Sequence, residues 1–427
     1  MTETARFVDD DKDLNLPKVQ ATDGQTGYDV AGLLRSTGNV MLDPGFVNTA
    51  SCESEITYID GNNGVLRYRG YPIEQLAEHA SFLETAFLVL YGALPTTSEL
   101  NSFEEAIRRK TLIDERMRDL FRCFPHRSHP MPVLSAGIMA LSTFSGSTAE
   151  KDLDSLNKAT LSLLAKVPTL AAFAYKNSMG QPTLYPDNSL GYVENFIRMS
   201  FGFPTEPYEF NEAITQGLEV LLILHADHEQ NCSTSTVRMV ASSGANLHAA
   251  VAAGVNALSG PKHGGANQAV VEMLQFIRDN DLTTKQFVEK VKNREDGVKL
   301  MGFGHRIYRN YDPRAAIIKK HADEILKLQT GRKDLLEIAK ELEETALNDD
   351  YFKERKLYPN VDFYSGLIYE AMGFPLNMFT VLFAIGRLPG WIAQYREQVT
   401  GSEKIWRPRQ IYTGCDVRDW IPFEQRS

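Results

Sequence analysis

The sequence predicts a mainly α fold with a small β-rich segment near the N-terminus. After residue 72, apolar residues recur at three- and four-residue spacing over most of the chain, which is the period of an amphipathic helix. Glycine, proline and asparagine separate these periodic runs. Before residue 72, two short alternating segments flank a turn that contains Asn-Gly, which is typical of a β-hairpin.

The expected elements follow in chain order. The first dozen residues are expected to be disordered, residues 14–71 to be β-rich, and residues 55–59 and 65–68 to form the hairpin. The clearest helical periods are 209–230, 265–280, 313–328, 334–347, 364–372 and 377–396. Residues 333–356 are so highly charged that we expect them to form largely a solvated face.

Composition narrows the class of protein. With 427 residues, 43% of them hydrophobic, the chain can bury a large core in two or three domains. No stretch approaches the roughly 20 apolar residues of a membrane span, and the acidic N-terminus is the reverse of a basic leader. Four scattered cysteines without a CxxC pair favour reduced thiols. We therefore expect a soluble, cytoplasmic protein.

The charge balance bears on the ligands. A net charge of -10 argues against broad nucleic-acid binding, which needs a basic footprint. If the substrates are anions, arginines must be concentrated locally against this overall charge.

Two histidines follow the apolar stripe of the 209–230 period. His225 and His228 are three residues apart and are expected to share one face at the C-terminal end of that helix. Paired histidines beside carboxylates resemble metal ligands. Core histidines that hydrogen-bond to neighbours and histidines that contact substrate are the alternatives, and this signal alone does not separate the three.

A third histidine lies in a glycine-rich loop. His263 is surrounded by Gly260, Pro261, Gly264 and Gly265 just before a predicted helix. The positive end of a helix dipole favours a neutral imidazole, whose N–H can donate to a carbonyl oxygen. A solvent-exposed loop histidine is the alternative.

The segment 300–314 carries the most information. Gly302 and Gly304 lack the third glycine of a dinucleotide fingerprint but permit close approach to a flat ligand. Asp312 is expected to cap a helix that begins at Pro313. Arg314 then lies in the first turn, where the dipole disfavours a cation, so we expect a nearby anion or a plain salt bridge.

Three further positions have both a structural and a functional interpretation. Asp362 is either an N-cap carboxylate or a general base flanked by aromatic residues. Arg387 is the single charged residue in 374–395 and must reach a carboxylate, a ligand or water. Arg407 and Arg409 near the C-terminus are ligands or ordinary surface charges.

Together these motifs resemble citrate synthase, specifically the bacterial branch of that family, over nearly the whole chain. The motifs that carry the resemblance are 224–230 (LHADHEQ), 260–267 (GPKHGGAN), 302–308 (GFGHRIY) and 358–362 (YPNVD), with 312–314 (DPR) and 407–409 (RPR) in place. Each motif is modest alone, but their common order is specific.

The resemblance implies a set of roles. Asp362 would remove a proton from the acetyl methyl group, His263 would donate a hydrogen bond to the thioester oxygen, and His305 would protonate the keto oxygen of oxaloacetate. The residues implied to bind oxaloacetate and citrate are His228, Arg314, Arg387 and Arg407. Those implied to contact coenzyme A are Leu300, Met301, Gly302, Gly304, Arg309 and Asn360. No metal or cofactor is implied, since coenzyme A enters as the substrate acetyl-CoA.

The resemblance also implies an organisation. It predicts a citrate-synthase-like two-domain helical fold: a β-rich segment (1–45), a large helical domain (46–264), a small helical domain (265–374), and a return to the large domain with the tail (375–427). The domains would close over oxaloacetate. Arg407 would reach the neighbouring subunit's site, so the minimum unit is a homodimer, with a hexamer as the alternative.

Rival interpretations remain open. The nearest is 2-methylcitrate synthase, which uses propionyl-CoA, because one methylene discriminates by only ~1–3 kcal/mol. A non-catalytic helical scaffold and a histidine-based metal-binding protein belong to other classes. Thr205 stands where some bacterial members carry a cysteine before Glu-Pro-Tyr, which argues against NADH control.

Overall fold

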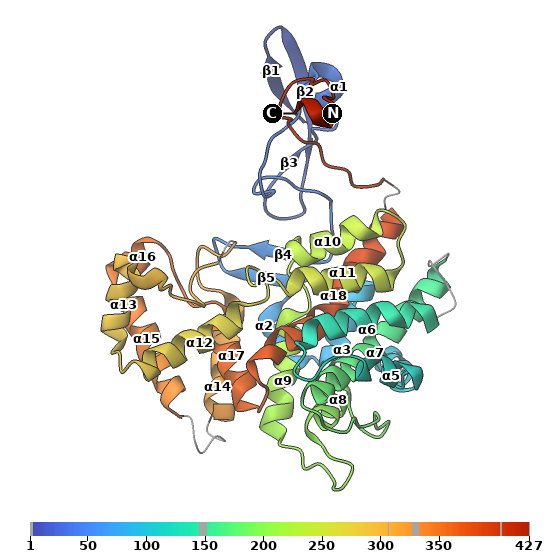
Figure 1. The fold of residues 1–427 in the computed structure, drawn as a ribbon, viewed down its shortest axis with the longest axis vertical. Coiled ribbons are helices and arrows are strands. Elements are labelled where there is room, and N and C mark those ends of the chain that lie inside the picture. The colour runs from blue at the N-terminus through green and yellow to red at the C-terminus, as the bar shows by residue number, and fades with distance from the viewer. Residues whose placement is uncertain (1–2, 145–151, 306, 327–332, 402–403, 427) are drawn as a thin grey trace. The chain divides into compact units, whose positions relative to one another are not determined.

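The computed structural model describes residues 3–144, 152–305, 307–326, 333–401 and 404–426 (Figure 1). Two compact units are present. One consists of Met1–Glu53 with Ile405–Ser427, and the other of Ser54–Lys404.

The first unit contains a three-stranded antiparallel sheet in the order β1-β2-β3. Its elements are β1 (Thr4–Asp9), β2 (Lys12–Val19), β3 (Gly27–Tyr28), α1 (Leu33–Thr37) and the 3₁₀ helix η3 (Phe423–Gln425). The expectation of a disordered N-terminus is therefore wrong. Phe7 pairs with Leu14 across the β1–β2 ladder, and the aspartates gather at the solvated turn, where Asp10 has a φ of 52°. The alternation of half-buried apolar residues prevails over the acidic composition of this segment.

The predicted hairpin opens the second unit and is confirmed. The antiparallel strands are β4 (Thr57–Asp60), β5 (Val65–Tyr68) and β6 (Tyr71–Pro72), with Thr57 opposite Tyr68 and Asp60 opposite Val65. The carboxylate of Asp60 accepts the backbone N–H groups of two turn residues, at 2.9 and 3.1 Å. Between β3 and β4 the chain forms α1 and otherwise turns and irregular backbone, so residues 14–71 contain less strand than expected.

Helices make up most of the second unit, and the mainly α class is confirmed. They are α2 (Ile73–His79), α3 (Phe82–Tyr91), α4 (Thr97–Arg108), α5 (Arg116–Arg122), α6 (Pro130–Phe144), α7 (Leu153–Ser178), α8 (Tyr192–Phe201), α9 (Glu212–His225), α10 (Cys232–Ala241), α11 (Leu247–Leu258), α12 (Ala266–Asp279), α13 (Thr284–Asn293), α14 (Pro313–Leu326), α15 (Lys333–Asn348), α16 (Asp350–Glu354), α17 (Val361–Ala371) and α18 (Phe379–Gly401), with 3₁₀ turns η1 (Glu295–Gly297) and η2 (Leu376–Met378).

Helix α18 lies at the centre of the core. It packs against α3, α7, α9, α10 and α11, while α12, α14, α15 and α17 pack on one another nearer the other side of this unit (Figure 1). Two glycines of α18 allow it to approach the end of α9 closely. A Cβ on Gly390 would lie 2.2 Å from the carbonyl oxygen of Ala226, and one on Gly386 would lie 2.9 Å from the Cβ of His225. The middle of α18 is thereby held directly against the end of α9. The expected division of the helices into a large domain and a small domain, with boundaries at 264 and 374, stays a prediction.

One described helix, Leu376–Gly401, is long and apolar enough to span a membrane. However, 83% of its most apolar window is buried inside the protein, as in the core helix of a globular protein.

Candidate active site

Most of the predicted site residues gather where four segments meet. These segments are the end of α9, residues 302–314, the start of α17 and the middle of α18. Ring contacts, hydrogen bonds and electrostatic interactions connect side chains from all four, as the following paragraphs describe.

His225 and His228 differ in structural role. Helix α9 ends at His225, so His228 lies beyond it and the prediction that both share a helical face is wrong. The Nδ1 of His225 hydrogen-bonds the carbonyl oxygen of Leu221 at 2.7 Å, and burial lowers the pKa of His225 to about 3. Burial, then Arg314 and His305, hold the pKa of His228 well below its usual value. Both imidazoles are therefore neutral near pH 7.

His228 faces His305 and Tyr308. The ring centroids of His228 and His305 are 5.3 Å apart, and the Nε2 of His228 lies 3.3 Å from the hydroxyl of Tyr308. The backbone N–H groups of Ile307 and Tyr308 donate to the Nδ1 of His305 at 3.1 and 3.3 Å. A neutral His305 therefore carries its proton on Nε2, where it can donate to a ligand.

The β4–β5 hairpin supports this segment. The backbone N–H of Arg309 donates to the carbonyl oxygen of Gly61 at 2.8 Å. A Cβ on Gly61 would lie 2.0 Å from the carbonyl oxygen of Ile307, and one on Gly64, whose φ is +67°, would lie 2.6 Å from that of Tyr311. Glycine at both turn positions thus allows the 307–311 backbone to lie directly on the hairpin.

Asp312 and Arg314 form a buried pair. The Nε and Nη2 of Arg314 donate to the two carboxylate oxygens of Asp312 at 3.0 and 2.9 Å, and both side chains are at most 4% exposed. Helix α14 begins at Pro313 as predicted, and the backbone N–H of Arg314 donates to Asp312. Burial opposes ionisation of Asp312, but Arg314 outweighs it and lowers the pKa of the carboxyl. The salt bridge expected as the plain alternative for Arg314 is present.

Asp362 lies in the first turn of α17 and is not its cap. The N-cap is Asn360, whose side-chain oxygen accepts the backbone N–H of Asp362 at 2.9 Å. Burial raises the pKa of Asp362 to about 6, and Asp312 acts in the same direction while Arg314 and Arg387 oppose it. The N-cap interpretation of Asp362 is therefore wrong. A pKa near 6 is in the range that suits a general base, and that role stays a prediction.

Arg387 is buried without a contact carboxylate among the described residues. Its Nε donates to the carbonyl oxygen of His225 at 2.6 Å, and its guanidinium lies 4.9 Å from the ring centroid of Phe383. Burial lowers the pKa of Arg387 to about 10, with Asp227 the largest opposing influence. The arginine stays charged at neutral pH and is suited to an anionic ligand.

His263 reaches the same surroundings through Phe383. Its ring centroid is 6.4 Å from that of Phe383, which also lies 4.5 Å from that of His225. The Nε2 of His263 lies 2.8 Å from the hydroxyl of Ser233, and the backbone N–H of Ser233 donates to it at 3.2 Å. A neutral His263 therefore carries its proton on Nδ1.

The predicted coenzyme A segment pairs with the start of α17. The backbone N–H of Asn360 donates to the carbonyl oxygen of Gly302 at 2.9 Å. The side-chain amide of Asn360 donates to the carbonyl oxygen of Gly304, also at 2.9 Å. Both glycines have a φ of 77°. Leu300 and Met301 are half-buried beside them, and Arg309 is exposed. Arg407 is exposed in the other unit. The roles of all these residues stay predictions.

No group of three or more His, Cys, Asp or Glu residues within the described ranges could hold a metal ion.

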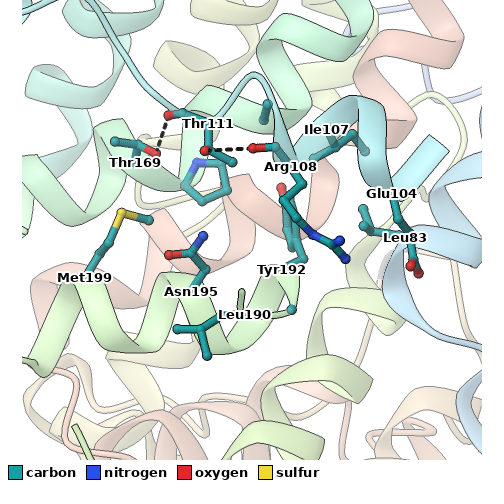
Figure 2. A pocket seen from close by; sticks show the side chains of 13 residues that line it. Leu83, Glu104, Ile107, Arg108, Thr111, Thr169, Leu190, Tyr192, Asn195 and Met199 are labelled. Carbon is teal, nitrogen blue, oxygen red and sulfur yellow. Dashed lines mark hydrogen bonds between the residues drawn. The ribbon is translucent and has the colours of Figure 1, made fainter. Parts of the chain in front are cut away.

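A separate cavity of about 90 Å³ lies among α3, α4, α7 and α8, and Figure 2 shows its lining. Thr169 donates to the carbonyl oxygen of Thr111, and the hydroxyl of Thr111 donates to that of Arg108 (Figure 2). None of the predicted site residues lines this cavity.

Sequence reasoning missed several residues of the cluster. Ser233, Tyr308 and Phe383 contact the predicted histidines, and Asp227 is a buried carboxylate just before His228. Ser233 follows the 224–230 motif by three residues and Tyr308 ends the 302–308 motif, so the motifs themselves were the available signal.

Comparison with known proteins identifies the relationship. A family model described as "Citrate synthase, C-terminal domain" matches residues 45–409. The chain is 57% identical over 427 residues to citrate synthase 1 of Mycobacterium tuberculosis, covering 100% of this chain and 99% of that protein. It is 57% identical over 413 residues to a citrate synthase of Corynebacterium glutamicum, covering 96% and 94%.

Solved structures agree in fold. Citrate synthase from Pyrobaculum aerophilum has a TM-score of 0.79 and 35% identity, covering 91% of this chain and 98% of that one. Citrate synthase from Thermoplasma acidophilum, in a ternary complex with carboxymethyl coenzyme A and oxaloacetate, has a TM-score of 0.84 and 31% identity, covering 90% of this chain and 100% of that one.

Proposed function

The chain belongs to the citrate synthase family of acyltransferase-type enzymes, and we propose that it condenses acetyl-CoA with oxaloacetate and hydrolyses citryl-CoA to citrate and coenzyme A. The observation that carries the proposal is the half-buried carboxylate of Asp362, with its pKa raised to about 6, within the electrostatic reach of Arg314 and Arg387. A base of this strength beside cationic groups suits carbanion chemistry next to a bound anion.

The first step is enolisation. Asp362 removes a proton from the methyl group of acetyl-CoA, and the negative charge moves onto the thioester oxygen. His263 donates to this oxygen from Nδ1, since Nε2 accepts from Ser233. A donor aimed at the developing oxyanion lowers the barrier most where water is excluded.

Condensation follows. The enol carbon attacks the keto carbon of oxaloacetate, and the keto oxygen takes a proton from the Nε2 of His305 to become the hydroxyl of citryl-CoA. Both backbone donors to Nδ1 of His305 support this tautomer. Water then attacks the citryl thioester carbonyl, and coenzyme A leaves as the thiol. The proton held by Asp362 passes through solvent to the Nε2 of His305, which restores both groups for the next turnover.

The carboxylates of oxaloacetate require cations. Arg387 supplies a guanidinium that contacts no carboxylate of the described residues. His228 faces His305, and Arg314 acts electrostatically on His228 in the same cluster. The two arginines supply positive charge locally, against the net charge of -10 of the whole chain. The adenine of coenzyme A would lie along Leu300–Gly304 with Arg309 near its phosphates. The chemistry needs no metal or redox cofactor.

We further propose a homodimer in which Arg407 enters the neighbouring subunit's site. The segment after residue 404 exposes large apolar side chains, with Val417 93%, Trp420 77% and Phe423 76% exposed. A second copy of the chain would cover such residues. A hexamer, closure of two domains over oxaloacetate and a cytoplasmic location stay predictions.

The decisive experiment is the release of free thiol from acetyl-CoA, measured with and without oxaloacetate. We expect release only with oxaloacetate, unchanged by a chelator. Hydrolysis without oxaloacetate, or loss of activity in chelator, would overturn the mechanism. Turnover with propionyl-CoA in parallel tests the alternative, 2-methylcitrate synthase, which a clear preference for propionyl-CoA would establish.

A further inference from the structure

Helix α18 is hydrogen-bonded to three successive residues at the end of α9. The bonds run from Arg387 Nε to His225 O at 2.6 Å, from Gly390 N to Ala226 O at 2.9 Å, and from Gln394 Nε2 to Asp227 Oδ2 at 3.3 Å. The three donors are three and four positions apart, so they share one face of α18. His228 is the next residue, and its placement therefore depends on this contact.

Asp227 is the unusual member of this set. Its carboxylate is fully buried, and its Oδ2 accepts from Glu229 N at 3.1 Å as well as from Gln394. The described residues place no cation within ion-pair distance of it. Burial raises the pKa of Asp227, and Arg387 is the largest influence in the opposite direction. A buried carboxylate without a contact cation needs a physical reason.

The amide of Gln394 is oriented by its other partners. Its Oε1 accepts from the Nε of Arg238 at 2.7 Å and from the Nε2 of Gln230 at 3.0 Å. The Nε2 of Gln394 must therefore point to Asp227 as a donor. The bonds from Gln394 and Glu229 both lower the pKa of Asp227 and so act against burial, which raises it.

Arg387 shows the complementary deficit. The Nε and Nη2 of Arg314 both donate to the carboxylate of Asp312. Arg387, by contrast, donates only from Nε, to the carbonyl oxygen of His225. No hydrogen bond links its terminal nitrogens to the described part of the chain. Two buried groups of opposite charge therefore lie within electrostatic reach of each other but not in contact.

We propose that ionised Asp227 is the positioning counter-charge of Arg387 in the empty site, held beyond contact distance so that the terminal guanidinium nitrogens stay available for a substrate carboxylate. This inference rests on the proposed binding of oxaloacetate at Arg387. Asp227 stabilises the unliganded protein and repels the bound dianion, so removing its charge should harm the empty protein but strengthen oxaloacetate binding.

The test compares the wild type with Asp227→Asn, which keeps the shape and the acceptor for Gln394. We expect a lower Tm without ligand, about tenfold tighter binding of oxaloacetate by calorimetry in the absence of acetyl-CoA, and a larger rise in Tm on adding oxaloacetate. The matched control is Glu219→Gln, a half-buried carboxylate on α9 that accepts the backbone N–H of Phe82 away from the cluster. It should lower Tm and leave oxaloacetate affinity unchanged.

Equal or weaker oxaloacetate binding by Asp227→Asn would overturn the inference, since a merely structural residue would act this way. Failure of the wild type to bind oxaloacetate would instead overturn the proposed function. Should Asp227→Asn not fold, Arg387→Met and the double variant Asp227→Asn/Arg387→Met decide. The double variant should have the higher Tm of the two, because it removes both buried charges. A lower Tm would contradict the pairing.

Discussion

Ser233 contacts the Nε2 of His263 with both its backbone N–H, at 3.2 Å, and its hydroxyl, at 2.8 Å. The backbone group can only donate, so Nε2 is an acceptor and the ring proton lies on Nδ1. The same hydroxyl accepts the indole N–H of Trp391 at 3.1 Å, which ties this histidine to the buried face of α18. The tautomer that the proposed mechanism needs is thus set by a residue outside the predicted triad.

Ser233→Ala should lower kcat about tenfold or more while oxaloacetate binding persists, because the Nε2 of His263 loses the hydroxyl of Ser233 and Trp391 loses its acceptor. Steady-state thiol release and calorimetric oxaloacetate binding measure the two effects. Ser135→Ala, which removes a buried hydroxyl bonded to the carbonyl oxygen of Ala252, is the control and should leave kcat near the wild-type value. Unchanged kcat in Ser233→Ala would separate Ser233 from the chemistry.

Asp362→Asn should reduce kcat by about 10³-fold or more, because the amide cannot accept the methyl proton. Oxaloacetate binding should stay near normal, since the arginines remain. Exchange of the acetyl-CoA methyl protons with deuterated solvent, followed by NMR, should be lost in the variant. If the variant kept most of the wild-type rate, the base would have to be another group.

The pH dependence follows from the same carboxyl. Asp362 must be ionised to act as a base, so kcat/KM for acetyl-CoA should fall as pH drops through an apparent pKa of about 6 or somewhat higher. The bound dianion offsets Arg314 and Arg387, which lower the pKa of Asp362 in the empty site, and therefore moves the apparent value upward. Rates at saturating oxaloacetate between pH 5 and 8 test this, with Tm followed in parallel. A flat profile would contradict the assignment.

Arg387→Leu should weaken oxaloacetate binding by about 100-fold or more, because truncating one partner of a buried charge pair commonly costs about 2–5 kcal/mol. Arg396→Leu is the matched control on the same helix. Its guanidinium bonds Asn157 and lies over Tyr91, away from the cluster, so oxaloacetate affinity should not change. Similar losses of affinity in both variants would indicate a general effect of packing in α18.

Gly61→Ala should lower activity although Gly61 is not itself a predicted site residue. Its Cβ would lie 2.0 Å from the carbonyl oxygen of Ile307, so the 307–311 backbone must move and carry His305 with it. We expect a lower kcat and a higher KM for oxaloacetate. Gly401→Ala adds the same methyl group in open space and should behave as the wild type. Wild-type kinetics for Gly61→Ala would show that the hairpin does not support the site.

Local sequence chemistry predicted much of the fold. Asn-Gly between alternating segments marked the β4–β5 hairpin, and proline after aspartate marked the start of α14 at Pro313. It failed where two local signals competed. The aspartates of the first segment suggested disorder, yet the paired alternation of apolar residues formed β1 and β2. At α17, Asn360 took the capping position that Asp362 could also have filled.

The sequence by itself determined the helical class, the family motifs and which residue types could carry the proposed chemistry, because periodicity, capping and residue type are properties of short segments. Only the tertiary structure decided the partners. Asp312 forms an ion pair with Arg314, Arg387 contacts no carboxylate in the described part of the chain, and Ser233 sets which nitrogen of His263 carries the proton. The bond from Arg387 to the carbonyl oxygen of His225 spans 162 positions and that between Ser233 and His263 spans 30, so neither can be read from one short segment. Burial likewise fixes the pKa of Asp362 only once the surrounding helices have packed.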